Sequence, residues 1–94
     1  MHTAWLDPHK IAPLPYNPAN RTDHKDLAFK ALYEEIKADG QKVPGTVVPN
    51  RDPDEWGDEY THVLAYGHRR RECAIMLGRR FLVLIDVDDG LTEA

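Results

Sequence analysis

The feature that most constrains this chain is a strand that runs through a glycine into an arginine-rich helix, over residues 60–78 (YTHVLAYGHRRRECAIMLG). Residues 60–66 carry β-branched and aromatic side chains, the composition of a half-buried strand. Gly67 permits a sharp turn. From about Arg69 the spacing is helical and Gly78 ends the helix. The apolar side chains expected on one face of this helix are Cys73, Ala74, Met76 and Leu77.

The turn between this strand and this helix predicts an anion-binding site. A helix N-terminus offers free backbone N–H groups and the positive end of the helix dipole. Arg69, Arg70 and Arg71 add guanidinium groups suited to phosphate oxygens. His68 can donate to a phosphate or accept a proton near neutral pH, which makes it the candidate catalytic residue.

A solvated arginine face, paired with carboxylates elsewhere in the chain, is the alternative interpretation of these arginines. Cations are mildly unfavourable at a helix N-terminus, so a bound anion would offset them. This misplaced charge favours the phosphate-binding interpretation.

The N-terminal half of the chain predicts one strand and one helix. Residues 1–9 are interpreted as a flexible lead-in, and residues 10–14 as a short edge strand, because Pro13 cannot donate to a sheet. The clearest helix covers residues 26–39, ends at Gly40 and is capped by an aspartate. The candidates for this cap are Asp23 and Asp26, and the apolar stripe of the helix is Phe29, Leu32, Tyr33 and Ile36.

The C-terminal half predicts the remaining strands. Residues 46–48 form a strand that pairs with residues 60–66 across a polar loop at 50–59. Residues 81–87 form a continuous β-favouring run, interpreted as a strand buried on both faces. The expected fold is therefore α/β (α+β): one small domain over residues 1–94, with a mixed sheet of about four short strands and two or three helices in the order β-α-β-β-α-β.

Composition limits the classes of function. The chain has 94 residues with 41% hydrophobic and 30% charged side chains, ordinary globular values that indicate no membrane association. The net charge of −4 argues against a surface that grips nucleic acid along its whole length. A single cysteine fits a reducing compartment, so we expect a cytoplasmic protein.

Several kinds of chemistry have no matching pattern. The five histidines and Cys73 show no zinc-ligand spacing, so no metal site is predicted. The chain lacks serine, which excludes a serine-hydrolase arrangement. Cys73 lies on the apolar side of its helix, where a buried structural thiol is expected.

Taken in order, three segments resemble the N-terminal domain of ParB partition proteins, in the ParB/sulfiredoxin superfamily. KIAPLPYNPANRT is similar to the opening strand and N-P-x-x-P-R-type segment. LAFKALYEEIKADGQKVPGTVV is similar to the first helix with its G-x-x-Q-P-x-x-V turn. VLAYGHRRRECAIMLGRRFLVLIDV is similar to the strand, G-E-R-R-x-x-A box, helix and closing strand. The resemblance covers residues 10–88.

The resemblance implies a nucleotide site for CTP or ATP. By matching position, the phosphates would be bound by Gly67, His68, Arg69, Arg70 and Arg21. The side of the base would be formed by Val43, Pro44 and Thr46. The resemblance also admits Mg²⁺ with the nucleotide and weak hydrolysis, that is, CTPase or ATPase activity.

Three positions depart from the family patterns. His68 stands where the ParB box has Glu, and Val43 stands where the turn usually has Gln. The sulfiredoxin G-C-H-R box has its catalytic cysteine where this chain has Gly67, so we do not expect sulfiredoxin chemistry.

Two alternative functions remain open at the level of sequence. One is a ParB-like nuclease, in which the same residues grip a DNA backbone phosphate. The other is a non-enzymatic interaction module of a phage or plasmid, with a protein partner or a second copy of the chain. DNA binding by this chain alone is expected to be weak because of its acidic charge.

Overall fold

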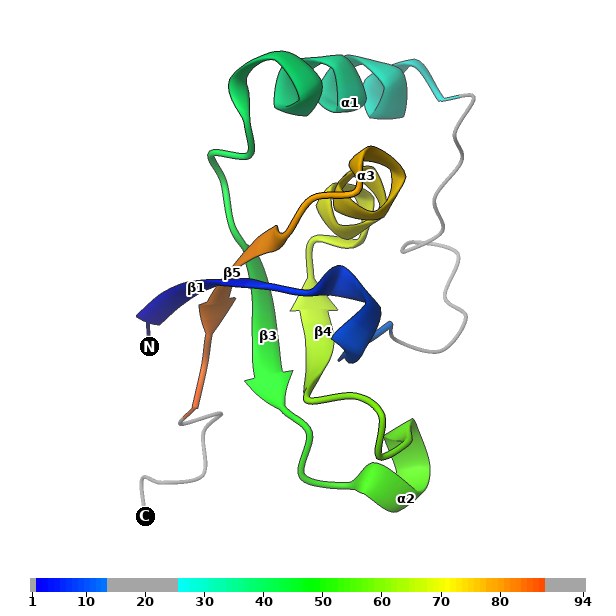
Figure 1. Cartoon of the computed structure of the whole chain (residues 1–94), viewed down its shortest axis with the longest axis vertical. Coiled ribbons are helices and arrows are strands. Elements are labelled where there is room, and N and C mark those ends of the chain that lie inside the picture. Colours follow the sequence, from blue (N-terminus) through cyan, green and yellow to red (C-terminus); the bar gives the residue numbers. More distant parts are fainter. Residues whose placement is uncertain (1, 14–25, 88–94) are drawn as a thin grey trace.

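A mixed five-stranded sheet forms the centre of the molecule in the computed structural model, which describes residues 2–13 and 26–87 (Figure 1). The strands are β1 (His2–Leu6), β2 (Ile11–Ala12), β3 (Gly45–Pro49), β4 (His62–Tyr66) and β5 (Phe81–Ile85), in the spatial order β1-β5-β3-β4-β2. β3 pairs with β4 antiparallel, as predicted, and with β5 parallel. The outer pairs are β1 with β5, antiparallel, and β2 with β4, parallel.

Three α-helices and one short 3-10 helix complete the described part of the chain: η1 (Pro8–Lys10), α1 (Leu27–Asp39), α2 (Pro53–Trp56) and α3 (His68–Leu77). Figure 1 shows α1 and α3 together at one end of the molecule and α2 at the other end. The α+β class with a mixed sheet is confirmed, with one strand more than the four expected.

Helix α1 forms where the sequence predicted it because its caps and its apolar stripe agree. Asp26 is the N-cap, and its Oδ1 accepts a hydrogen bond of 2.8 Å from the Ala28 N–H. Gly40, with a φ of 85°, follows the last turn. Phe29 and Ile36 are buried against Cys73 of α3, and Leu32, Tyr33 and Leu77 pack around them. The predicted stripe is therefore the contact between α1 and α3.

A second cluster lies between α3 and the sheet. It contains Ile11, Val47, Leu64, Ala74, Phe81, Val83 and Ile85. Burial alternates along β5: Phe81, Val83 and Ile85 are buried, whereas Leu82 and Leu84 are only partly covered. The prediction of a strand buried on both faces was therefore wrong, since only one face of β5 is covered by the helices.

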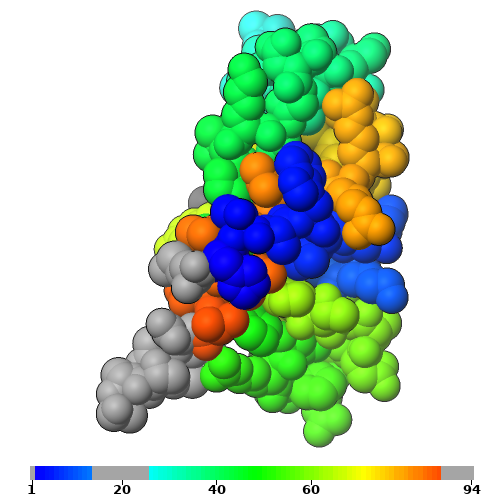
Figure 2. Space-filling model, turned by 60° about the vertical axis from the view of Figure 1, so that its left-hand side comes forward, coloured from blue at the N-terminus to red at the C-terminus, as the bar shows by residue number. Residues whose placement is uncertain are grey.

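The N-terminus gives the second correction. Residues 2–6, predicted as part of a flexible lead-in, form β1, with Trp5 opposite Leu82 and Leu6 opposite Phe81. Ala4 and Leu6 pack on the cluster between α3 and the sheet. Figure 2 shows β1 lying across the surface. The pairing partner of β1 lies about 80 residues away, which explains why a local pattern does not reveal it.

Two further differences are smaller. The loop predicted at 50–59 contains the four-residue helix α2, capped by Asp52, whose Oδ1 accepts from the Glu55 N–H at 3.2 Å. Met76, expected on the apolar face of α3, is 45% exposed, because that helix turns only a narrow face to the core. Within residues 2–13 and 26–87, no helix is both long and apolar enough to cross a membrane.

Candidate functional site: the N-terminus of α3

Two glycines in contact bring the predicted site together. Gly67 has a φ of 105° and a ψ of 31°, and it is the N-cap of α3. A β-carbon at Gly67 would lie 2.8 Å from the Cα of Gly45, at the start of β3. A β-carbon at Gly45 would lie 2.9 Å from the Tyr66 carbonyl oxygen. The absence of side chains at both positions therefore lets β3 pass directly against the turn into α3.

This contact places the residues predicted for the side of the base beside the turn. Thr46 lies opposite Tyr66 in the sheet, and Val43 and Pro44 precede it at the same end of β3. Gln41 fixes this segment: its side-chain amide donates to the carbonyl oxygens of Val43 and Leu82, both at 2.9 Å, and its Oε1 accepts from the Leu82 N–H. Val43 is 54% exposed.

The first turn of α3 has backbone donors that no side chain satisfies. The Arg71 N–H bonds to the Gly67 carbonyl oxygen at 2.9 Å, so the N–H groups of His68, Arg69 and Arg70 precede the first intrahelical bond. Among the described residues, no side chain caps this helix. Within residues 2–13 and 26–87, the helix N-terminus therefore presents three N–H donors without a partner, together with the positive end of its dipole.

His68 stands at the first position of this helix. Its Nε2 atom is buried and has no hydrogen-bond partner within the described part of the chain. Burial, and secondarily the nearby Arg71 cation, lower the pKa of His68 below its ordinary value of 6.5. The imidazole is therefore largely neutral at pH 7, and its buried nitrogen lacks the partner that buried polar atoms normally have.

The three arginines have three different roles. Arg69 forms an ion pair with Asp26, with 3.2 Å between Nη2 and Oδ2. Arg71 is half-buried, and its Nε donates to the Pro8 carbonyl oxygen at 3.1 Å, which ties α3 to η1. Arg70 shows no ion pair or side-chain hydrogen bond within the described residues. The alternative of arginines paired with carboxylates thus holds for Arg69, and Arg71 is structural.

One predicted site residue cannot be placed, and two residues of interest were missed. Arg21 lies outside the described residues. Asp26 was predicted as a helix cap but not as a partner of Arg69, because that pairing spans 43 positions. Tyr66 was assigned only to a strand, although this residue is 72% exposed beside the turn. An aromatic residue directly before the turn glycine is the signal that could have identified it.

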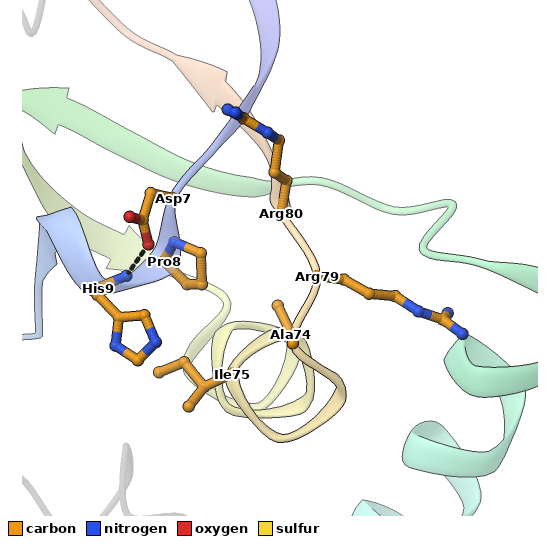
Figure 3. A pocket seen from close by; sticks show the side chains of 8 residues that line it. Asp7, Pro8, His9, Ala74, Ile75, Arg79 and Arg80 are labelled. Carbon is orange, nitrogen blue, oxygen red and sulfur yellow. Dashed lines mark hydrogen bonds between the residues drawn. The ribbon is translucent and has the colours of Figure 1, made fainter.

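A cavity of about 280 Å³ lies at the opposite end of α3, between that helix and η1 (Figure 3). Asp7, Pro8, His9, Ala74, Ile75 and Arg80 contribute to its lining. Figure 3 shows Arg79 and Arg80 pointing apart. The Arg79 guanidinium donates to the carbonyl oxygens of Ile36 and Lys37, at the C-terminal end of α1, at 2.9 and 3.2 Å. Arg79 therefore also lines the cavity, but its guanidinium caps the C-terminal end of α1.

Cys73 is fully buried, as predicted. Burial, with a smaller contribution from Glu72, raises the pKa of its thiol. A buried, protonated thiol is a poor nucleophile, so the side chain serves the packing between α1 and α3.

The arrangement of strands and helices is similar to that of two solved structures. Sulfiredoxin from Arabidopsis thaliana aligns with a TM-score of 0.70 and 22% identity, over 99% of this chain and 96% of that one. The C-terminally truncated chromosome-partitioning protein ParB from Caulobacter crescentus, complexed with CTP-γ-S, aligns with a TM-score of 0.68 and 19% identity. That alignment covers 93% of this chain and 45% of the ParB chain, so this chain spans less than half of the ParB structure.

These similarities define the class of the molecule: it has the ParB/sulfiredoxin fold, as the three sequence segments predicted. No protein-family model matches the chain. No curated protein matches it either.

Proposed function

We propose that this chain binds a nucleoside triphosphate, CTP or ATP, with its phosphates at the N-terminus of α3. The observation that carries the proposal is the buried Nε2 of His68, beside a first helical turn that no side chain caps; among residues 2–13 and 26–87 this nitrogen has no hydrogen-bond partner. An unsatisfied buried polar atom is costly, and rotation of the imidazole toward the turn would let a phosphate oxygen supply the missing partner, provided that the nitrogen carries the proton. The free N–H groups of the same turn would bind further oxygens.

Arg70 and Arg69 supply the side-chain charge in this proposal. Among the described residues Arg70 has no ion pair or side-chain hydrogen bond, whereas Arg69 would exchange its exposed contact with Asp26 for a phosphate. That exchange is inexpensive because both partners are substantially exposed, with side-chain exposures of 48% for Arg69 and 36% for Asp26.

One observation on a related structure and one on this chain bear on the class of ligand. The ParB structure of the same fold was determined with CTP-γ-S, which supports a nucleotide as the ligand class. The redox chemistry implied by the name sulfiredoxin finds no support in this chain, because Gly67 occupies the turn and Cys73 is buried. We therefore propose nucleotide binding without thiol chemistry.

Mg²⁺ would accompany the nucleotide chiefly through its phosphates. Within residues 2–13 and 26–87, no three carboxylate, imidazole or thiol groups are placed together to hold a metal ion. A phosphate-bound Mg²⁺ needs only one or two protein ligands. Hydrolysis, with His68 orienting water or accepting a proton, is the weaker part of the proposal and needs its own assay.

Calorimetric titration with CTP, ATP and GTP, with and without Mg²⁺, tests the binding proposal. We expect one nucleotide to bind, and Arg70→Ala to weaken it by about 2 kcal/mol, roughly 30-fold, the scale of a charge-assisted hydrogen bond. Arg80→Ala is the matched control, since it removes a guanidinium at the opposite end of α3. The proposal would be refuted if none of the three nucleotides binds, or if Arg70→Ala and Arg80→Ala lower the nucleotide affinity equally.

A further inference from the structure

Tyr66, at the end of β4 and directly before the turn glycine, is 72% exposed. Trp5, an exposed aromatic residue in the edge strand β1, is 51% exposed and is therefore less accessible than Tyr66. No hydrogen bond involving the Tyr66 hydroxyl is seen in the described part of the chain. Contacts within the described residues therefore do not explain why an aromatic ring is exposed at the predicted phosphate site.

A change of register in the sheet gives the ring this position. Val47 lies opposite Leu64, but the next residue back, Thr46, lies opposite Tyr66, so Ala65 is an extra residue in β4. Without this bulge, Tyr66 would point to the same side as Leu64, which is completely buried. Residues directly opposite one another share a face, so the bulge places Tyr66 on the face of Thr46 instead.

The backbone that carries this ring is held firmly. The Tyr66 carbonyl oxygen lies so close to Gly45 that a β-carbon there would approach it to 2.9 Å. On the next residue, Gly67, a β-carbon would lie 2.8 Å from the Cα of Gly45. Only the side chain of Tyr66 is left free to move, and an aromatic side chain has just two χ angles to fix on binding.

The ring also lies beside the residues predicted for the side of the base. Thr46 is its direct neighbour across the sheet, and the exposed Val43 precedes Thr46 at the same end of β3. The backbone donors for phosphate begin two residues after the ring, at His68. A ligand that combines an aromatic ring with a phosphate chain can therefore contact both features at once.

We propose that Tyr66 is the stacking platform for the base of the bound nucleotide. This inference rests on the proposed function and extends it, because it assigns a residue that contributes affinity for the base and none for the phosphates. Stacking tolerates every base, since each has a π face. Discrimination between bases would then depend on contacts to the base edge from the segment at Val43 and Thr46.

Comparison of a nucleotide with inorganic tripolyphosphate tests the inference. Both ligands are titrated into the wild-type chain and into Tyr66→Ala, Tyr66→Phe and, as the control for an exposed aromatic residue elsewhere, Trp5→Ala. We expect Tyr66→Ala to weaken the nucleotide by about 5- to 150-fold, the range of base–aromatic stacking, and to leave tripolyphosphate unchanged. Tyr66→Phe should retain the wild-type affinity because it keeps the ring.

The possible failures are distinguishable. If the wild-type chain binds both ligands and Tyr66→Ala changes neither affinity, the stacking inference fails alone. If Tyr66→Ala weakens both ligands equally, the residue shapes the turn instead of holding the base, and the inference is again overturned. If the wild-type chain binds neither ligand, the proposed function fails and the inference fails with it.

Discussion

Replacement of Gly67 by alanine tests the contact on which the candidate site depends. Gly67 has a φ of 105°, where a β-carbon is strained, and that β-carbon would lie 2.8 Å from the Cα of Gly45. The obstructing atom belongs to the backbone of β3, between β4 and β5 in the sheet, so it cannot move aside as the end of a flexible side chain can. Gly67→Ala therefore combines a conformational penalty with a steric one.

The two penalties can be estimated separately. The left-handed conformation costs a residue with a β-carbon about 1–2 kcal/mol. Overpacking in a tightly packed region costs about 1–3 kcal/mol more. The expected loss is about 2–5 kcal/mol, a large fraction of the roughly 5–14 kcal/mol that stabilises a domain of this size. The melting temperature should fall by about 10–30 °C.

Gly78→Ala is the matched control. Gly78 is also left-handed, with a φ of 66°, but a β-carbon there meets no atom within 4 Å. The free energy of unfolding of Gly78→Ala should therefore fall only by the conformational penalty, about 1–2 kcal/mol. Urea unfolding followed by far-UV circular dichroism measures both variants. Equal losses in Gly67→Ala and Gly78→Ala would show that the contact between Gly45 and Gly67 contributes no strain, and would refute the reasoning.

Two further predictions concern Asp26 and the partly buried histidines His62 and His68. Asp26→Ala should lower the free energy of unfolding by about 1 kcal/mol, because it removes the cap of α1. Asp26→Asn keeps the cap, and its free energy of unfolding should stay within about 0.5 kcal/mol of the wild type, since the exposed pair with Arg69 contributes little. If urea unfolding shows that Asp26→Asn loses as much stability as Asp26→Ala, the ion pair and not the cap stabilises the protein, and the prediction is wrong. Burial lowers the pKa of His62 and of His68 below 6.5, so the unfolded chain binds more protons than the folded chain at mildly acidic pH. The stability supplied by these two groups is fully present above about pH 7 and is lost as the pH falls below 6.5; a urea midpoint that does not decrease between about pH 7.5 and pH 5.5 would contradict this sign.

Local patterns predicted the elements that form by local rules. Helix α1 was predicted from its aspartate cap, its apolar spacing and its terminal glycine, and all three act as expected in the structure. The strand, glycine turn and helix around Gly67 were predicted from strand composition, the turn glycine and helical spacing, to within two residues at the strand start and one at the helix start. The pairing of β3 with β4 was predicted from the polar connection between them, interpreted as that of a hairpin.

Long-range contacts explain what the sequence did not predict. β1 has no strong pattern in its five residues, and it exists as a strand because β5 offers it an edge. The partly covered face of β5 could not be distinguished from a buried one, because Leu82 and Leu84 are as apolar as their buried neighbours. Neither the pair between Arg69 and Asp26 nor the bond from Arg71 to Pro8 is visible without the fold.

The sequence by itself therefore determined that a glycine turn delivers three arginines and a histidine to a helix N-terminus, because capping, turn and periodicity signals act over a few residues. Only the tertiary structure decided what each of these side chains does. It turned Arg71 inward and paired Arg69, and it left the Nε2 of His68 buried without a partner within the described residues. Through a one-residue bulge it also placed the exposed ring of Tyr66 beside them. The physical reason is that burial, pairing and register depend on neighbours brought together from distant parts of the chain.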